Sequence, residues 1–440
     1  MLRSMINGGC KVGFFGLGAS NIALLSHLPL KNCSVILRSD RPIDRSIIPS
    51  GINVSAIYEG KAACKEINED ILFFSPSVRR DRGGLEEAKR RGVIFSSDAE
   101  LFFSENKKPI FAITGSDGKS TTATLTNLLL LAGGIKSELI GNIGEPMICH
   151  LESDVKCYVC ELSSFMLTYV CPIAERGCVT NITPNHLDWH KDFEEYKKTK
   201  IKLLNSSKKV VISDELGEIA KAYGVISDRL SYSELNGRCK AEVCLTIEDG
   251  YICANLEKIV RVDEIAIKER HNIRNLMMAI AMTWDIVDRN AILSVAKGFR
   301  GLPHRCERFL GSGGVEYIDS SIDSTPERTS QTLRSLGREV VLILGGRSKG
   351  LDYGELKYAI RKYVSNAVIV GENAAEIYNA ICECTAAEIL PDFESAVRRG
   401  DALAKDVGVL LLSPASTSYD AFKNYVERGE KFKEIVRKLP

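Results

Sequence analysis

The sequence predicts an α/β protein with three domains: a Rossmann-like N-terminal domain, a central P-loop-type ATPase sheet and a Rossmann-like C-terminal domain. Short apolar runs alternate with helical stretches along most of the chain, which is typical of parallel sheets covered by helices. Several runs end in glycine-rich or polar loops, the position where open α/β sheets hold ligands. The length of 440 residues provides for several hydrophobic cores. We place the domains at residues 1–107, 108–299 and 300–440.

The composition argues against two classes of protein. The formal charge is +1, from 58 basic and 57 acidic residues that are intermixed, which disfavours a nucleic-acid or membrane-surface protein. The first nine residues lack the apolar segment of a secretory signal, and apolar runs such as residues 128–132 are far too short to cross a bilayer. The fourteen cysteines are scattered and often lie among apolar neighbours. We therefore expect reduced thiols in a cytoplasmic protein.

The N-terminal segment opens as strand, glycine turn, helix and strand over residues 11–37. Gly16 and Gly18 let a phosphate or a uridine-type ligand approach the backbone. Asn21 stands where an NAD site requires a third small residue, so a different nucleotide, or tight packing alone, is favoured over NAD. The next strand, residues 71–74, runs into a polar loop that begins at Ser75, and the polar residues 104–109 mark the first boundary.

The central domain begins with a candidate phosphate site. Residues 110–113 are apolar and predict a buried strand, residues 114–118 form a glycine turn, and a helix follows from Ser120. The backbone N–H groups of such a loop, the positive end of the helix dipole and Lys119 all face an anion, and Ser120 can hold a magnesium ion. The strict P-loop spacing is not met because Ile113 occupies its first glycine position. A glycine turn that merely precedes Lys-Ser is the alternative.

Three further central segments carry polar residues where a strand ends. Residues 141–144 form a glycine-framed loop, and the strand 156–161 ends in Glu161, an acid placed to hold the magnesium of a nucleotide or simply exposed at a strand end. The strand that starts at Cys178 runs into a loop with His186 and His190. Their spacing allows a zinc pair, but Pro184 disfavours the helix that such a pair would need. Residues 192–201 predict an amphipathic helix whose lysines form a solvated face.

The third segment again alternates between apolar runs and helical stretches. Apolar strands are expected at residues 339–344, 366–371 and 407–413, each followed by a helical stretch, which predicts another parallel sheet covered by helices. Three α/β units with ligand loops suit a reaction that joins three substrates.

Nine short segments occur in an order that resembles the Mur ligases, most of all the members that add D-glutamate to UDP-N-acetylmuramoyl-L-alanine. The resemblance spans nearly the whole chain and implies an ATP-dependent acid–amino-acid ligase that acts through an acyl phosphate in peptidoglycan precursor synthesis. The matching segments are residues 115–121, 141–144, 161–165, 181–188, 196–200, 271–275, 301–308, 344–349 and 412–429.

The resemblance also implies roles for individual residues around ATP and two magnesium ions. Lys119, His186 and Lys200 would be catalytic, and Lys200 would be carbamylated so that its added carboxylate completes the second metal site. Magnesium would be held by Ser120, Glu161, His186 and Lys200. ATP would be bound by Gly115, Asp117, Gly118, Lys119, Ser120, Thr121, Asn272, Asn275, Arg305 and Asp319.

The two other substrates are assigned in the same way. UDP-N-acetylmuramoyl-L-alanine would meet the N-terminal loop, with Arg38 and Ser39 as a further guess, and D-glutamate would meet a lysine, a serine and an aromatic residue of the C-terminal domain. An ordinary Arg305–Asp319 ion pair and a purely packing role for Tyr425 remain alternatives. The substrate residues are Gly18, Ala19, Ser20, Asn142, Ser163, His186, Lys349, Ser418 and Tyr425.

Three departures from the family pattern keep other functions open. Asp117 replaces asparagine and puts a negative charge beside the triphosphate. Ser321, in the segment 321–325, stands where many relatives have lysine, and Ser77 replaces a frequent glycine. A related ligase with another amino acid or acceptor, such as a folylpolyglutamate type, and a non-catalytic nucleotide-binding scaffold are the alternatives. We expect a monomer with small-molecule partners only.

Overall fold

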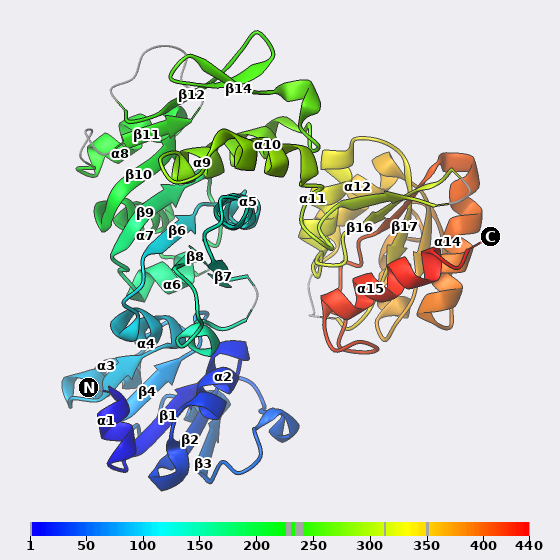
Figure 1. Ribbon diagram of the computed structural model, residues 1–440. Coiled ribbons are helices and arrows are strands. Elements are labelled where there is room, and N and C mark those ends of the chain that lie inside the picture. Colours follow the sequence, from blue (N-terminus) through cyan, green and yellow to red (C-terminus); the bar gives the residue numbers. More distant parts are fainter. Residues whose placement is uncertain are drawn as a thin grey trace. The chain divides into compact units, whose positions relative to one another are not determined.

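The computed structural model describes residues 2–143, 145–187, 189–225, 230–233, 241–311, 314–348 and 352–439. The chain divides into two compact units, Met1–Phe299 and Arg300–Pro440. The first unit contains two sheets and the second contains one (Figure 1). The α/β class is confirmed for all three sheets, whereas the division into three domains at residues 107 and 299 stays a prediction.

The N-terminal sheet is entirely parallel, with the strand order β3-β2-β1-β4-β5 of a Rossmann-like half. Alternate residues of a strand point to opposite faces, so Val12 and Phe14 pack under α1 and α2 while Phe15 packs under α3. Its strands are Lys11–Phe15 (β1), Ser34–Ser39 (β2), Val54–Glu59 (β3), Ile71–Phe74 (β4) and Ile94–Ser96 (β5); its helices are Leu2–Asn7 (α1), Ala19–His27 (α2), Gly83–Arg90 (α3) and Asp98–Glu105 (α4).

The central sheet has the order β14-β13-β12-β11-β10-β9-β6-β8-β7, parallel from β7 to β12 and antiparallel in its last two pairings. The carboxyl ends of β6, β8 and β9 therefore lie side by side. The strands are Ile110–Thr114 (β6), Ser137–Gly141 (β7), Cys157–Glu161 (β8), Ala174–Val179 (β9), Ser207–Ser213 (β10), Leu230–Ser233 (β11), Cys244–Glu248 (β12), Tyr251–Ala254 (β13) and Glu257–Arg261 (β14). The helices are Lys119–Ala132 (α5), Ser164–Tyr169 (α6), Phe193–Asn205 (α7), Gly217–Ala222 (α8), Arg270–Thr283 (α9) and Arg289–Gly298 (α10).

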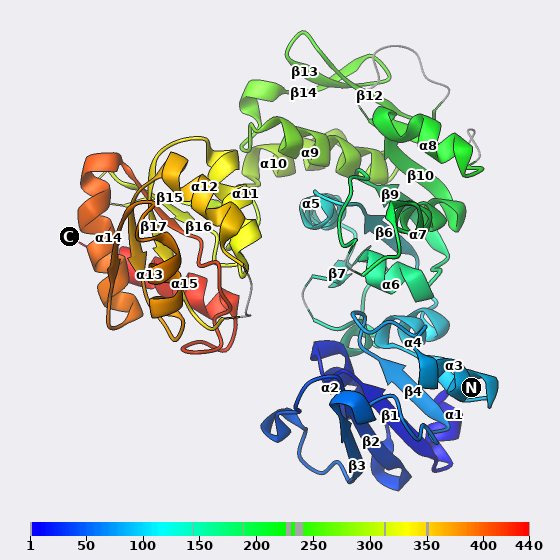
Figure 2. The same ribbon diagram turned by 180° about the vertical axis from the view of Figure 1, so that it is seen from behind.

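The second unit is one sheet between two helical layers, which Figure 2 shows from behind. Val341 and Ile343 pack on α14 and α15, and Leu342 and Leu344 pack on α11, α12 and α13. The strand order is β15-β16-β20-β17-β18-β19, with only the β15 edge antiparallel. The strands are Glu307–Leu310 (β15), Glu316–Asp319 (β16), Val340–Leu344 (β17), Val364–Ile369 (β18), Ala386–Ile389 (β19) and Val409–Leu412 (β20); the helices are Pro326–Leu336 (α11), Gly354–Tyr363 (α12), Ala374–Ile381 (α13), Phe393–Val407 (α14) and Tyr425–Val436 (α15).

Arg38 at the end of β2 is part of the structural core. Its side chain is fully buried, and its guanidinium donates to both carboxylate oxygens of Glu69, at 2.5 and 3.2 Å, and to the carbonyls of Ala63, Lys65 and Glu66. These five bonds use all five N–H groups of the arginine. The Arg38 side chain therefore has no N–H group left for a ligand, and the guess that this strand end contacts the UDP-substrate stays a prediction.

Most cysteines carry free thiols, as expected. Twelve are free among the residues that the structure describes, whereas Cys244 is disulfide-bonded, so the expectation of reduced thiols is wrong for that residue. Cys157 and Cys160 are three residues apart on β8 and point to opposite faces of the strand, which prevents them from chelating one metal. Among the described residues, none of the helices combines the length and the apolar character needed to traverse a bilayer.

Asp98 joins the N-terminal sheet to the central one. It is the first residue of α4, and its carboxylate accepts hydrogen bonds from the backbone N–H groups of Met147 and Ile148, at 3.0 and 2.8 Å. Burial, the largest influence, raises the pKa of Asp98 to about 6 in spite of these two bonds. The folded state therefore holds a proton on Asp98 at a pH where the unfolded chain has lost it.

This raised pKa predicts how the stability depends on pH. The protonated Asp98 contributes to the free energy of unfolding. This contribution is fully present below pH 3.8 and is lost as the pH rises through about 6. Asp98→Asn cannot ionise, so its unfolding free energy relative to the wild type should rise by about 2 kcal/mol between pH 4 and pH 7. Urea unfolding of both proteins at each pH measures this difference. A difference that is constant across this range would contradict the prediction.

Candidate functional site

The phosphate loop lies between β6 and α5, as the sequence predicts. Gly118 precedes the helix in a left-handed conformation, with φ of 76°, and no side chain caps the helix N-terminus. The backbone N–H groups at the start of α5 are thus presented to a ligand. Lys119 folds back over the loop and donates to the carbonyl of Ser116 at 2.7 Å. Ser120 and Thr121 follow in the first turn and are largely buried.

Asp117 is exposed at the tip of this loop, so its charge faces solvent. Its backbone N–H donates to the side chain of Asn181 at 2.9 Å, and its carbonyl accepts from Thr180 at 2.5 Å. Gly115 lies against Thr180 so closely that a Cβ would collide with its hydroxyl. Sequence analysis did not assign Thr180 and Asn181 to the site. Their place directly after β9, beside β6, is the signal that could have identified them.

Lys200 is buried under the phosphate loop and not on a solvated face. Its ammonium donates to the carbonyl of Gly115 at 2.7 Å and lies 4.7 Å from the centre of the Tyr196 ring. Burial, and then the nearby charge of Lys119, lower the pKa of Lys200 well below its ordinary value. The hydroxyl of Tyr196 bonds Ser116 in the same loop at 2.9 Å, a contact that sequence analysis also missed. A neutral amine at Lys200 is a nucleophile that can take up carbon dioxide.

Glu161 ends β8 beside the phosphate loop and is 1% exposed. One carboxylate oxygen accepts from the side-chain amide of Asn142 at 2.8 Å, and the other is buried without a hydrogen-bond partner. A buried oxygen in this state requires a cation or a donor. Glu161 and Ser120 therefore fit one magnesium ion, and Lys200 would be a carboxylate ligand of a second ion once carbamylated.

His186 lies in a tight turn that follows β9. Its backbone is left-handed, with φ of 54°, and its carbonyl accepts from the N–H groups of Trp189 and His190 at 3.1 and 2.9 Å. The imidazole is exposed, with its centre 4.8 Å from that of the Phe165 ring. His190 is instead buried between Phe165, Trp189 and Tyr196, and burial lowers its pKa. In the described parts of the chain these two histidines belong to no cluster of metal ligands, so zinc is not supported.

The two asparagines predicted for adenine lie on α9. Asn275 is buried against the phosphate loop and accepts from the hydroxyl of Thr122 at 3.3 Å. A Cβ on Gly118 would collide with its side-chain oxygen. Asn272 lies one turn earlier and donates to Glu269 at 3.3 Å. The structure therefore brings Asn275, but not Asn272, into contact with the loop.

A cavity of about 200 Å³ lies between the N-terminal and central sheets of the first unit. It is lined by Ala19 and Ser20, which start α2, and by Asn142 and Phe165 from the central sheet. Gly18 precedes α2 without a side-chain cap. Ser163 caps α6, where its hydroxyl accepts from the N–H of Met166 at 3.2 Å. Three of the predicted substrate residues, Ala19, Ser20 and Asn142, thus line one cavity, and Gly18 and Ser163 lie within two residues of its lining in the sequence.

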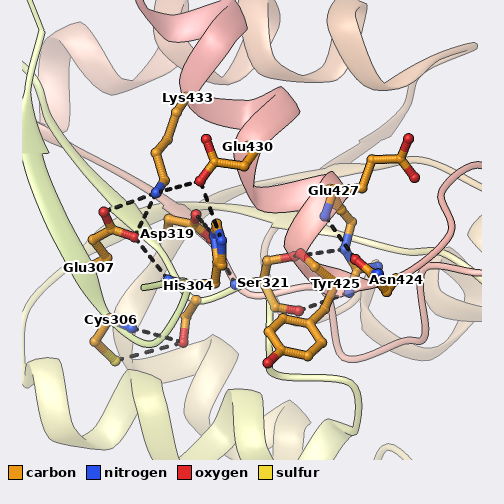
Figure 3. Close-up of polar contacts among 12 residues, drawn as sticks. His304, Cys306, Glu307, Asp319, Ser321, Asn424, Tyr425, Glu427, Glu430 and Lys433 are labelled. Atoms are coloured by element: carbon orange, nitrogen blue, oxygen red, sulfur yellow. Dashed lines mark hydrogen bonds and ion pairs between the residues drawn. The ribbon is translucent and has the colours of Figure 1, made fainter. Parts of the chain in front are cut away.

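Arg305 and Asp319 lie in the second unit, where Asp319 pairs with His304 and not with Arg305 in the part of the chain that the structure describes (Figure 3). The His304–Asp319 distance is 2.7 Å, and the second oxygen of Asp319 accepts from the N–H of Ser321 at 2.9 Å. The ligand atoms of His304, Glu307 and Asp319 all lie within 4.8 Å of one another. The ammonium of Lys433 bonds Glu307 at 2.8 Å and already supplies the positive charge there, so no metal is assigned.

Two of the residues predicted to bind the amino-acid substrate lie at the carboxyl edge of the same sheet. Ser418 is buried in the loop after β20, and Tyr425 begins α15 with its ring 6.2 Å from that of His304. Figure 3 shows Ser321 next to Tyr425, whose carbonyl accepts from the serine hydroxyl at 2.8 Å. Lys349 lies outside the described residues.

Comparisons with known proteins agree with this arrangement. A family model, the Mur ligase middle domain, matches residues 113–283. The chain is 32% identical to the UDP-N-acetylmuramoylalanine–D-glutamate ligase of Clostridium botulinum (strain Alaska E43), over 98% of this chain and 97% of the relative. It is 34% identical to the ligase of the same name from Acetivibrio thermocellus, over 98% and 96%.

Solved structures with lower identity share the fold. A UDP-N-acetylmuramate–alanine ligase from Thermotoga maritima has a TM-score of 0.56 at 17% identity, covering 97% of this chain and 98% of its own. A folylpolyglutamate synthase from the same organism has a TM-score of 0.56 at 12% identity, covering 77% and 92%.

Gly118→Ala should damage the phosphate loop and little else. The new Cβ would require an L-residue in the left-handed region and would press on Asn275, a strain of about 1–2 kcal/mol before any rearrangement. We expect ADP affinity, measured by calorimetry, to fall about tenfold or more. Gly134→Ala, also at positive φ but in open space, is the matched control. Equal losses of affinity in both variants would contradict a specific role of the loop.

Proposed function

This chain belongs to the Mur ligase family, and we propose that it joins D-glutamate to UDP-N-acetylmuramoyl-L-alanine with ATP as the energy source. The identity to ligases of that name, over nearly the whole of both chains, supports the choice of substrates. The observation that carries the chemistry is the cluster of Lys119, Glu161 and Lys200 around an uncapped helix N-terminus.

The proposed reaction has two steps. The carboxylate of the alanyl group attacks the γ-phosphorus of ATP, so that ADP leaves and an acyl phosphate forms. The amine of D-glutamate then attacks the acyl carbon, and phosphate leaves with the bonding electrons. Both steps bring anions together, so the protein must supply cations and hydrogen-bond donors and no nucleophile of its own. Lys119 and the N–H groups of α5 meet this requirement at the β- and γ-phosphates.

Magnesium completes the charge balance in this proposal. When bound, the ion would supply positive charge that offsets the negative charge developing on the phosphate oxygens. Glu161 and Ser120 would hold one ion, and His186 with carbamylated Lys200 would hold a second. The unpartnered oxygen of Glu161 and the lowered pKa of Lys200 support these assignments.

The remaining residues are assigned to substrates by their place in the fold. The cavity beside Gly18, Ala19, Ser20, Asn142 and Ser163 would take the UDP-substrate. Arg305 and Asp319 would meet the phosphates and ribose of ATP, and Asn272 and Asn275 would meet adenine. Lys349, Ser418 and Tyr425 would bind D-glutamate. We further propose a monomer in the cytoplasm, where ATP and nucleotide sugars are available.

Phosphate release tests the proposal directly. The purified protein with ATP, magnesium and UDP-N-acetylmuramoyl-L-alanine should release phosphate with D-glutamate, and much less with L-glutamate or with no amino acid. Release that depends on another amino acid would support a ligase with a different amino-acid substrate and would indicate the segment 321–325 as the origin of that specificity. ADP binding without release under any of these conditions would favour the scaffold alternative.

Lys200→Ala tests the carbamate. Loss of a magnesium ligand should lower kcat by at least about a hundredfold, because a preorganised cation beside the transferred phosphoryl group is lost. Intact-mass analysis of the wild type at raised bicarbonate should show one added carbamate that the variant lacks. Lys202→Ala removes an amine two residues away on α7 that donates to the carbonyl of Leu167, and serves as the control. Equal activities of the two variants would exclude a metal-binding role for Lys200.

A further inference from the structure

One arginine of the N-terminal domain holds the turn that carries His186. Arg79 lies in the loop after β4, and its guanidinium donates to the carbonyl of Trp189 at 2.6 Å. The same guanidinium lies 4.9 Å from the centre of the Trp189 ring. The indole N–H of Trp189 donates in return to the carbonyl of Ser77, two residues before Arg79, at 2.8 Å. Trp189 is thus bound to this loop at its backbone, its ring face and its indole nitrogen.

The same guanidinium also reaches the helix that carries Lys200. It donates to both carboxylate oxygens of Glu195, at 3.2 and 3.3 Å, and Glu195 lies in the first turn of α7. Glu195 also accepts from the N–H of Lys191 at 2.6 Å, at the end of the His186 turn. The side chains of Arg79 and Glu195 are 19% and 26% exposed, so solvent screens the pair less than a surface ion pair.

These contacts matter because the His186 turn is strained. The backbone of His186 is in the left-handed region, and turns of this kind persist only where the surroundings hold them. The rings of His186 and Trp189 both pack on Phe165, with centres 4.8 and 4.7 Å from it, so a displacement of Trp189 would displace the imidazole. Asp81 fixes the other edge of the Arg79 guanidinium, at 2.6 and 2.8 Å.

The loop of Arg79 also borders the cavity assigned to the UDP-substrate. Pro76 and Arg80 line that cavity, on either side of Arg79 in the sequence. The backbone N–H of Arg80 donates to the hydroxyl of Tyr169, a third residue of the cavity wall, at 2.9 Å. A ligand in the cavity therefore meets the loop whose arginine holds the His186 turn.

We propose that Arg79 is a positioning residue that fixes the His186 turn and the start of α7, and thereby couples the UDP-substrate cavity to the magnesium site. The coupling between the cavity and the magnesium site rests on the proposed function, whereas the role of Arg79 in holding the His186 turn does not. Arg79 touches no reacting atom. It acts through Trp189 and Glu195.

Tryptophan fluorescence tests whether Arg79 holds the His186 turn, and this measurement does not require enzyme activity. The chain has two tryptophans, so Trp284→Phe leaves Trp189 as the single emitter. In this background Arg79→Ala should shift the Trp189 emission to the red and raise its acrylamide quenching constant about twofold. Arg82→Ala removes an arginine of the same loop that bonds Asp40, away from the turn, and should leave both unchanged. Unchanged emission in Arg79→Ala would overturn the proposal.

Magnesium titration tests the coupling. With ADP present, the magnesium concentration at the midpoint of the Trp189 emission change should rise several-fold in Arg79→Ala and not in Arg82→Ala. The kcat for phosphate release should fall by about tenfold to a hundredfold, as expected for a misplaced catalytic group, with the KM for ATP little changed. Altered emission together with a normal magnesium dependence and a normal kcat would overturn the proposed coupling between Arg79 and the magnesium site.

Two further outcomes, a variant that does not fold and a wild type without activity, can be distinguished from a failure of the Arg79 proposal. Arg79→Lys keeps the charge but cannot bridge Trp189, Glu195 and Asp81 together, so it should reproduce the emission shift even where Arg79→Ala is too unstable to measure. A wild type without turnover would overturn the proposed function, and the emission titration with ADP and magnesium would still decide whether Arg79 positions the turn.

Discussion

The site is organised around a buried amine and a buried carboxylate at one edge of the central sheet. Lys200 lies under the phosphate loop in a place where its charged form is disfavoured, and Glu161 has one oxygen without a partner. Buried polar groups normally find partners; Lys200 donates to the carbonyl of Gly115, whereas one oxygen of Glu161 accepts from no donor among the described residues. In the proposed function, carbon dioxide would add to this amine and a cation would bind this carboxylate. The parallel order of β6, β8 and β9 brings the phosphate loop and Glu161 to the same edge, and α7 carries Lys200 to the carbonyl of Gly115 in that loop.

The N-terminal and central sheets are joined by polar contacts of two kinds. Asp98 accepts two backbone N–H groups in a buried setting that raises its pKa, and Arg79 makes a half-buried cluster with Glu195 and Trp189. Such contacts specify geometry more than they add stability, because the desolvation of the charged groups offsets much of their attraction. They fix the cavity between the two sheets relative to the phosphate loop, which the proposed reaction between bound groups requires.

The sequence was most informative where a strand ends in a loop. The runs before Gly115 and Gly345, and the strand that ends in Glu161, are short and largely apolar, and each forms a strand of a parallel sheet. It was least informative about burial. The lysine-rich pattern of residues 192–201 predicts a solvated face for Lys200, and only the family resemblance places it at the metal site; Arg38 is guessed near the UDP-substrate because it ends a strand. Tertiary packing decides both cases, and no local pattern records it. Thr180, Asn181 and Arg79 were missed for the same reason, since their partners are distant in sequence.

The unusual Ser321 has a physical explanation in the second unit. Arg428 is 2% exposed, and its guanidinium donates to the hydroxyl of Ser321 at 3.0 Å and to the carbonyls of Ser321 and Ser416 at 2.9 and 3.1 Å. Burial lowers its pKa to about 10. A lysine at position 321 would place a second cation against this guanidinium, whereas the serine accepts from it and passes a hydrogen bond on to Tyr425. Because Arg428 also ties together the loops after β16 and β20, the edge that holds Ser418 and Tyr425 is shaped by a buried cation whose hydrogen-bond partners are neutral.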